Sequence, residues 1–131
     1  MLDLLNINTG CISGLLLLLL ALAIGHALSD FSLQGDYLSR SKNRHGQAVG
    51  ELKDGILGNW IYSMSAHSLI HCGAVWLITG SAFLGILEFV LHWLIDFAKC
   101  ENWTGFGADQ LLHYLCKVLY VALIYTGLVV I

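Results

Sequence analysis

The chain has 131 residues, of which 57% are hydrophobic and only 11% are charged. Soluble domains carry about 25% charged residues, so this composition argues against a water-soluble domain. Together with a mean hydropathy of +0.75, it predicts an integral membrane protein. The length predicts one domain, residues 1–131. A net charge of -3 without a basic block excludes nucleic acid as an expected partner and leaves the lipid bilayer.

The first predicted element is an apolar helix over residues 11–30, which contains an unbroken run of leucines from Leu15 to Leu20. No Lys or Arg precedes this helix, so we interpret it as a mature span rather than a cleaved signal peptide. A polar segment follows over residues 31–59. Within it, apolar residues at helical spacing predict a short interfacial helix, and these residues are Val49, Leu52, Ile56 and Leu57.

Three further apolar stretches follow, over residues 60–80, 81–99 and 108–131. Each is about 20 residues long, the length that crosses a bilayer. A backbone in lipid must satisfy its own hydrogen bonds, so the spans are predicted to be helices. The predicted fold class is therefore an all-α integral membrane protein, a bundle of four transmembrane helices.

The basic residues predict the orientation of this bundle. Apart from Lys117 within the fourth span, all the basic residues fall on the same side of the predicted membrane. They are Arg40, Lys42, Arg44, Lys53 and Lys99. The positive-inside rule then places the polar segment 31–59 in the cytoplasm and both termini on the non-cytoplasmic side. The expected location is the inner (cytoplasmic) membrane, crossed several times.

Every predicted span carries two ionisable residues at i, i+4 spacing, which places both on one helical face. The pairs are His26 and Asp30, His67 and His71, His92 and Asp96, and Asp109 and His113. The first and third spans run toward the cytoplasm and carry their pairs near their ends. The second and fourth run away from it and carry theirs near their starts. All four pairs are therefore expected at one depth, in the cytoplasmic half of the bundle.

A metal site would explain why these residues are tolerated in lipid. One charged residue at the centre of a spanning helix costs roughly 2.5–3.5 kcal/mol, and a divalent cation binds neutral imidazole and carboxylate together. Di-metal sites in helical bundles use inward-facing His and carboxylate side chains in the same way. We predict one or two divalent ions, for which zinc fits best. The predicted ligands are His26, His67, His71, His92, Asp96 and His113, and the predicted catalytic residues are Asp30 and Asp109.

Other interpretations remain open for single residues. A lone His in a membrane helix often hydrogen-bonds across helices. Glu88, one turn before His92, is either a proton-handling group or extra ligand, or a neutral acid bonded to a neighbouring helix. Asp36 and Gln34 either fold back over the site or are ordinary loop residues. Haem ligation by the His residues is disfavoured, because three of the four pairs include a carboxylate.

Several motifs carry a family resemblance. They are H-x3-D-F-x-L-Q-x-D (residues 26–36), Lys42-Asn43, H-x3-H (67–71), H-W-L-I-D (92–96) and D-Q-x2-H (109–113). Together, over about residues 25–114, they resemble a family of small bacterial and phage membrane proteins catalogued as domain of unknown function 3307. More loosely, the chain resembles membrane-bound proteins labelled metal-dependent hydrolases. That resemblance implies metal chemistry by His and Asp at helix ends.

Two functions follow as expectations. The first is a metal-dependent hydrolase that acts on a lipid or lipid-linked substrate at the cytoplasmic leaflet. Its metal would lower the pKa of a bound water, and a carboxylate would accept the proton. The second is a non-enzymatic membrane protein, either an ion-handling or transport unit or a structural subunit with a His/Asp metal or hydrogen-bond cluster. A transport path through four short spans would need a homo-oligomer.

Overall fold

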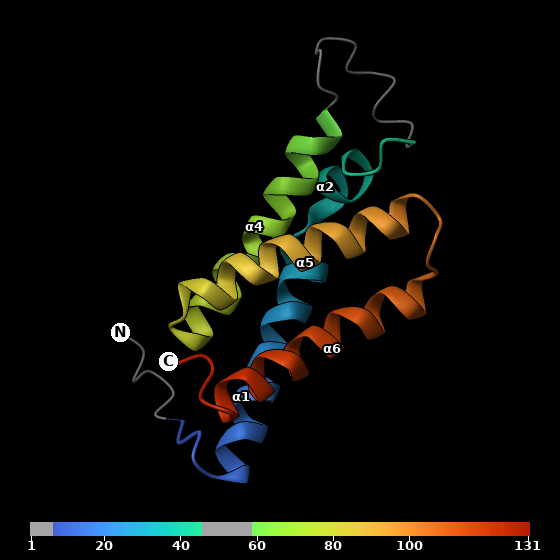
Figure 1. Cartoon of the computed structure of the whole chain (residues 1–131). Helices are drawn as coiled ribbons and strands as arrows, with labels where there is room; N and C mark the ends of the chain where they lie inside the picture. Colours follow the sequence, from blue (N-terminus) through green and yellow to red (C-terminus); the bar gives the residue numbers. More distant parts are fainter. Residues whose placement is uncertain (1–6, 46–58) are drawn as a thin grey trace.

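The computed structural model describes residues 7–45 and 59–131, and the regular elements in this part of the chain are all helical. Four long helices occur where four spans were predicted, with a short helix between the first two (Figure 1). In chain order the elements are α1 (Ile12–Ala27), which continues into the π-helix η1 (Leu28–Ser32), α2 (Gly35–Ser41), α4 (Asn59–Thr79), α5 (Ala82–Cys100) and α6 (Phe106–Tyr125). The all-α prediction is therefore confirmed.

The four long helices alternate in direction. In Figure 1, α1 and α5 run one way and α4 and α6 run the other. Contacts join α1 to α4, α4 to α5, α5 to α6 and α6 back to α1, with the α4–α5 pair the most extensive. Each helix therefore packs beside two antiparallel neighbours, and the ends of α1 and α5 lie beside the starts of α4 and α6.

Small residues allow the tight turn between α4 and α5 and the close packing of the two helices. Gly80 has a φ of 73°, a left-handed conformation that glycine adopts without strain, and its N–H donates to Trp76 O at 2.7 Å. Ser81 begins α5 by accepting a hydrogen bond from Leu84 N. Further along, a Cβ atom at Gly85 would lie 3.0 Å from the backbone oxygen of Cys72. The absence of a side chain at Gly85 therefore lets the two helices approach closely.

The described structure departs from the predicted elements in two places. The fourth helix begins at Phe106 and ends at Tyr125, before a turn with Gly127 at a φ of 72°, instead of covering 108–131. The polar segment contains α2, which was not predicted. The predicted interfacial helix at Val49–Leu57 and the basic residue Lys53 lie outside the described residues.

By length and composition, two helical segments could cross a membrane, Ile12–Ser32 and Trp60–Thr79. α5 has a comparable length but includes Glu88, Asp96 and Lys99.

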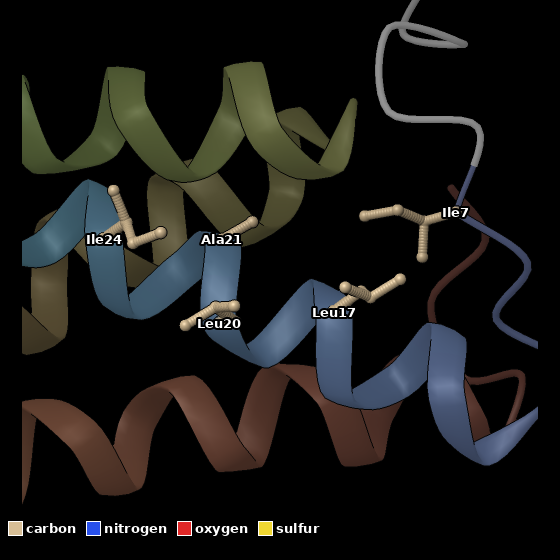
Figure 2. Close-up of a pocket in the computed structure, with 5 residues that line it drawn as sticks. All are labelled: Ile7, Leu17, Leu20, Ala21 and Ile24. Atoms are coloured by element: carbon tan, nitrogen blue, oxygen red, sulfur yellow. The ribbon is translucent and has the colours of Figure 1, made fainter.

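The interior of the bundle has two chemically different halves. Near the α4–α5 turn it is an apolar cluster of Leu18, Leu22, Val75, Leu84, Tyr120 and Ile124. Toward the other end, the buried side chains are mostly His, Asp, Glu and Lys. The outward faces are apolar, as on α1, where a shallow groove is lined by Ile7, Leu17, Leu20, Ala21 and Ile24 (Figure 2). In the polar half of the bundle, buried polar side chains and exposed apolar ones thus reverse the arrangement usual in soluble proteins.

Candidate metal centre

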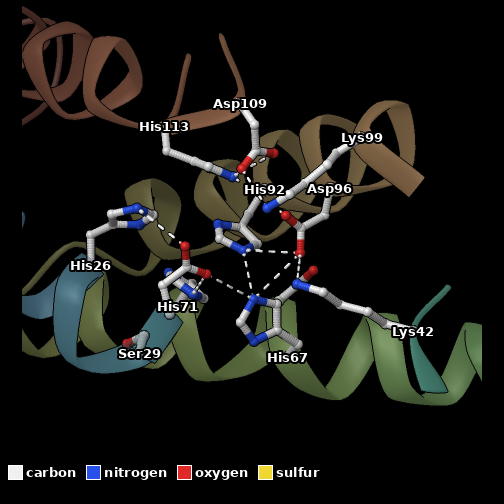
Figure 3. Close-up of polar contacts among 12 residues, drawn as sticks. His26, Ser29, Lys42, His67, His71, His92, Asp96, Lys99, Asp109 and His113 are labelled. Carbon is white, nitrogen blue, oxygen red and sulfur yellow. Dashed lines mark hydrogen bonds and ion pairs between the residues drawn. The ribbon is translucent and has the colours of Figure 1, made fainter. Parts of the chain in front are cut away.

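The structure brings all eight predicted site residues together in the polar half of the bundle, and Figure 3 labels all of them except Asp30. All five His residues, Asp96 and Asp109 are at most 2% exposed, and the Asp30 side chain is 8% exposed. Their helices converge there because the i, i+4 spacing turns each pair inward and the alternating helix directions place the pairs at one level. The sequence spacing therefore indicated the correct helix faces.

One set of side chains lies around a common point. Asp30 Oδ1 is 3.2 Å from His67 Nε2 and 3.5 Å from His71 Nε2. His92 Nε2 is 3.1 Å from His67 Nε2. One ligand atom from each of these four residues lies within 4.8 Å of the other three. Ligands placed about 2.0–2.1 Å from a tetrahedral zinc ion are about 3.3 Å apart, so these spacings fit a shared cation.

Two other sets overlap with the first. One consists of His92, Asp96 and His113, and the other of His26, His71, Glu88 and His92. His92 belongs to all three sets, and its ring stacks on that of His71 with centroids 3.6 Å apart. His92 is therefore the centre of the cluster. Asp109 belongs to none of these sets, although its Oδ1 lies 3.6 Å from His113 Nε2.

Several buried polar atoms in this cluster have no hydrogen-bond partner among the described residues. They are Nδ1 of His26, His67, His92 and His113, Nε2 of His71 and His113, and Oδ1 of Asp109. Buried polar groups are nearly always satisfied, and an uncompensated one costs roughly 1–3 kcal/mol. Such atoms are concentrated in this cluster, and one of them, His71 Nε2, faces Asp30 Oδ1 in the four-residue set.

The π-helix η1 supplies Asp30 to this point. A π-helical turn closes i to i+5 hydrogen bonds, so it shifts the side chains after it relative to an α-helix. Leu33 N donates to Leu28 O at 2.9 Å, the closing bond of this turn. Asp30 then faces His67 and His71 on α4 as well as His26, whose Nε2 lies 3.7 Å from Asp30 Oδ2.

Lys42 reaches the cluster from the end of α2. Its Nζ donates to Asp96 Oδ2 at 2.5 Å, and its side chain is 7% exposed. The Gln34 side-chain oxygen accepts a hydrogen bond from Lys42 Nζ at 3.1 Å, and its amide nitrogen donates one to the backbone oxygen of Asp30. Gln34 therefore does fold back over the site. Asp36 does not, since its side chain is 96% exposed beside Arg40.

α6 contributes two more polar contacts at the same level. Gln110 Nε2 donates to Asp30 Oδ2 at 2.8 Å, and Gln110 Oε1 lies 3.4 Å from His26 Nε2. Lys99 Nζ donates to Asp109 Oδ2 at 2.8 Å. Gln110 thus bridges α6 to Asp30, and Lys99 compensates Asp109.

Glu88 faces the cluster from the apolar side. Its Oε1 accepts from Lys117 Nζ at 2.6 Å and its Oε2 accepts from Tyr120 OH at 2.7 Å. The same Oε1 lies 3.4 Å from His92 Nδ1. The neighbouring helix therefore provides Glu88 with an ammonium group and not only with the neutral hydrogen-bond partner expected for an uncharged acid.

Sequence analysis missed the lysines of the cluster. Lys117 lies four residues after His113 and eight after Asp109, so helical spacing alone placed it on the inward face of α6. Helical spacing gave no such signal for Lys42, which was assigned to a basic cytoplasmic loop, although Lys42-Asn43 is one of the motifs of the family resemblance. Its partner Asp96, on α5, is 54 positions away, and the packing of both α2 and α5 against α4 brings the two together.

At the polar end of the bundle, Arg44 forms a two-point ion pair with Glu101. Arg44 Nε and a second guanidinium nitrogen each lie 2.6 Å from a Glu101 carboxylate oxygen, and His45 Nε2 lies 3.1 Å from Glu101 Oε1. The hydrogen bond from Arg44 holds the pKa of Glu101 below its usual range. The pair ties the segment after α2 to the end of α5.

Together these observations define a class, an all-helical protein whose interior holds a His, carboxylate and lysine cluster able to accommodate a metal ion. The family model described as "Protein of unknown function (DUF3307)" matches residues 16–130, and the chain belongs to this family. No curated protein and no solved structure gives a match to the chain.

Proposed function

We propose that this chain is a multi-pass membrane protein that binds one divalent cation and uses it for hydrolysis. The supporting observation for the membrane is the distribution of burial. Large apolar side chains on all four long helices are more than a third exposed, among them Leu16, Leu69, Ile86 and Leu115, whereas the buried residues include five His and several charged groups. Exposed apolar surface of this extent marks contact with a membrane or another protein, and its presence on all four long helices supports lipid.

The proposed orientation follows the basic residues at the polar end of the bundle. Arg40 and Arg44 lie there with Lys99, whose side chain is 30% exposed, and the apolar ends of α4 and α6 carry none. The positive-inside rule then places the polar end at the cytoplasmic face of the inner membrane and both termini on the opposite side. The cluster would lie just inside the cytoplasmic leaflet.

The cation is proposed within the set of Asp30, His67, His71 and His92, held by the three imidazoles, with Asp30 beside it as the base. This is the four-residue set with a carboxylate and three imidazoles, and the single observation that carries the proposal is the convergence of their ligand atoms within 4.8 Å. The Nε2 atoms of His67 and His92 lie 3.1 Å apart, and two lone pairs at this distance repel each other. The contact is favourable only when a proton or a cation lies between the two nitrogens. Zinc fits this mixed imidazole and carboxylate set.

The charges of the cluster favour one divalent ion over two. Asp30, Glu88, Asp96 and Asp109 carry four negative charges when ionised, and Lys42, Lys99 and Lys117 carry three positive charges. With neutral imidazoles, one negative charge remains. A divalent cation together with one hydroxide ion would neutralise it, whereas two divalent cations would leave a buried excess of positive charge, which is costly in a membrane interior.

The proposed reaction is hydrolysis of a lipid or lipid-linked substrate. A bound divalent cation lowers the pKa of a water molecule and so supplies a nucleophile near neutral pH. Asp30 is the better candidate base of the two predicted carboxylates, because it contacts His67 and His71 and is partly exposed. Asp109 is fully buried and held by Lys99, so its proposed role is to orient His113.

A structural role for the cluster is the second candidate, and the lysines favour it. Each of Asp96, Asp109 and Glu88 already has an ammonium partner, so a folded state without metal has much of its charge compensated. A transport role has less support. Beyond Glu88, Lys117 and Tyr120 the apolar cluster begins, and the buried Thr79 and Ser81 near the α4–α5 turn bond to backbone groups of the adjoining helices.

Metal analysis tests the proposal. The protein, purified in detergent and exposed to zinc, should retain about one ion per chain by elemental analysis, and the His67→Ala/His71→Ala variant should retain none. His45→Ala is the matched control, since His45 lies at the surface outside the cluster. Absence of stoichiometric metal from the folded wild type would favour the structural role.

Hydrolysis is tested separately. Zinc-loaded protein would be mixed with vesicles of phosphatidylethanolamine and phosphatidylglycerol, and the products would be followed by mass spectrometry. The expected result is release of a hydrolysed lipid by the wild type and its loss in Asp30→Asn, with zinc content retained. Bound zinc without any lipid product would restrict the site to a non-hydrolytic role on these lipids.

A further inference from the structure

Glu88 lies on the opposite side of two His rings from the proposed cation. His92 directs Nε2 toward His67 and Nδ1 toward Glu88 Oε1, at 3.1 and 3.4 Å. His71 directs Nε2 toward Asp30 Oδ1 at 3.5 Å and Nδ1 toward Glu88 Oε1 at 3.8 Å. Since the two rings stack 3.6 Å apart, one carboxylate oxygen faces the Nδ1 edges of both.

The position of the imidazole proton decides whether these rings can bind a cation at Nε2. A neutral imidazole has one N–H and one lone pair, and the cation needs the lone pair. An acceptor beside Nδ1 draws the N–H to that nitrogen and leaves Nε2 free. His92 Nδ1 has no hydrogen-bond partner among the described residues, and Glu88 Oε1 is the carboxylate oxygen it faces. A carboxylate behind a ligating imidazole is a recurrent arrangement in metal sites.

Glu88 is itself held in place from α6. Lys117 Nζ lies 2.6 Å from Oε1 and Tyr120 OH lies 2.7 Å from Oε2, and all three side chains are at most 1% exposed. Lys117 supplies a positive charge that keeps a carboxylate at this depth from being an unpaired buried ion. Tyr120 occupies the second oxygen and so directs the first toward the His rings.

We propose that Glu88 is a positioning residue that holds His92, and with it His71, in the Nδ1–H tautomer, so that both present Nε2 to the cation. Lys117 and Tyr120 hold Glu88 in that role. The inference rests on the proposed cation site for its purpose, but the tautomer itself is a property of the metal-free protein. The two ideas can therefore fail independently.

Two double variants separate this role from simple charge balance. Glu88→Gln/Lys117→Met and Glu88→Leu/Lys117→Met both remove the buried ion pair without leaving an unpaired charge. Glutamine keeps an oxygen that can accept from Nδ1, and leucine keeps none. The measurements are ¹⁵N NMR of the His rings in the metal-free protein, and zinc affinity by competition with a chelator.

The wild type and the glutamine double variant should show the Nδ1–H tautomer for His92. The leucine double variant should lose it and bind zinc roughly 10–100-fold more weakly than the glutamine variant. An Nε2–H tautomer in the metal-free wild type, or equal zinc affinity in both double variants, would overturn the inference. If the leucine variant does not fold, the wild-type tautomer decides alone. If the wild type binds no zinc, the cation proposal fails while the tautomer result still decides this one.

Discussion

Lys117 Nζ lies 2.6 Å from Glu88 Oε1, and both side chains are 1% exposed. The pair joins α6 to α5 at the boundary between the polar cluster and the apolar cluster of the bundle. Neither group can turn to solvent, so each charge depends on the other for compensation. Removing one member of a buried pair is far more costly than replacing both.

Lys117→Met should therefore lower the free energy of unfolding by about 3–5 kcal/mol, because it leaves the Glu88 carboxylate uncompensated. Thermal or denaturant unfolding in detergent measures the change. Glu88→Gln/Lys117→Met should recover most of the loss, since no buried charge remains. Arg40→Gln is the control, because Arg40 is 74% exposed and should change stability little. Equal loss in the single and double variants would contradict the ion-pair interpretation.

Lys42→Met should raise the zinc affinity of the cluster by about tenfold, an effect of about 1.4 kcal/mol. Lys42 donates to Asp96 Oδ2 beside His67 and His92, so its ammonium group repels any cation bound there. Methionine keeps the apolar length of the side chain without the charge. Competition with a chelator measures the affinity. An unchanged or weaker affinity would mean that Lys42 organises the site more than it opposes the metal.

Zinc retention should fall as the pH falls from about 8 to about 5, because the imidazole ligands must be neutral and an unperturbed His titrates near pH 6.5. Protons and zinc compete for the same Nε2 atoms. Elemental analysis after equilibration at each pH measures the bound metal. His45→Ala should follow the same curve as the wild type, because the His45 side chain bonds to Arg44 and Glu101 at the surface, outside the cluster. Retention independent of pH would argue against imidazole ligands.

The Arg44–Glu101 pair should contribute stability near neutral pH and lose it in acid. Arg44 lowers the pKa of Glu101 in the folded state. The contribution is therefore present above the pKa of an unfolded glutamate, about 4.3, and is lost as the pH falls through the folded value. Thermal unfolding of the wild type and Glu101→Gln should differ at pH 7 and converge in acid. A gap that persists in strong acid would point to packing instead of charge.

Gly85→Ala should destabilise the bundle although alanine favours helices. The added Cβ would lie 3.0 Å from Cys72 O and 3.1 Å from Trp76 Cβ, so α4 and α5 must separate. Gly107→Ala is the matched control in α6, where nothing lies within 4 Å of the added atom. Helix propensity predicts a change of up to about 1 kcal/mol in favour of alanine at the control position. Equal melting temperatures for both variants would contradict close packing at Gly85.

Local sequence patterns predicted most of the helical fold. Apolar stretches of the length of a span correspond to α1 with η1, α4, α5 and α6, because helix formation in such stretches depends on nearby residues. The end of the fourth helix was wrong by several residues, since its last residues are as apolar as the helix itself. Only Gly127 marked the turn, and one glycine is a weak signal within an apolar run.

The candidate site was predictable to the extent that helical periodicity determines it. Spacing of i, i+4 identified the inward faces that carry His26, His92 and their partners, and the chain order of the spans predicted that the pairs share one level. The same periodicity would have identified Lys117. The sequence did not predict the π-helical turn that directs the Asp30 side chain toward His67 and His71, because such a turn has no reliable local signature.

By itself, the sequence determined the number of long helices, their polar faces and the residue types available for chemistry, because these depend on spacing along one helix. The tertiary structure alone decided which charge compensates which. Lys42 pairs with Asp96 across 54 positions and Lys117 with Glu88 across 29, and the uncharged Gln110 donates a hydrogen bond to Asp30 across 80. The reason is physical: a buried charge takes the partner that helix packing brings within about 3 Å, and distance in space is independent of distance along the chain.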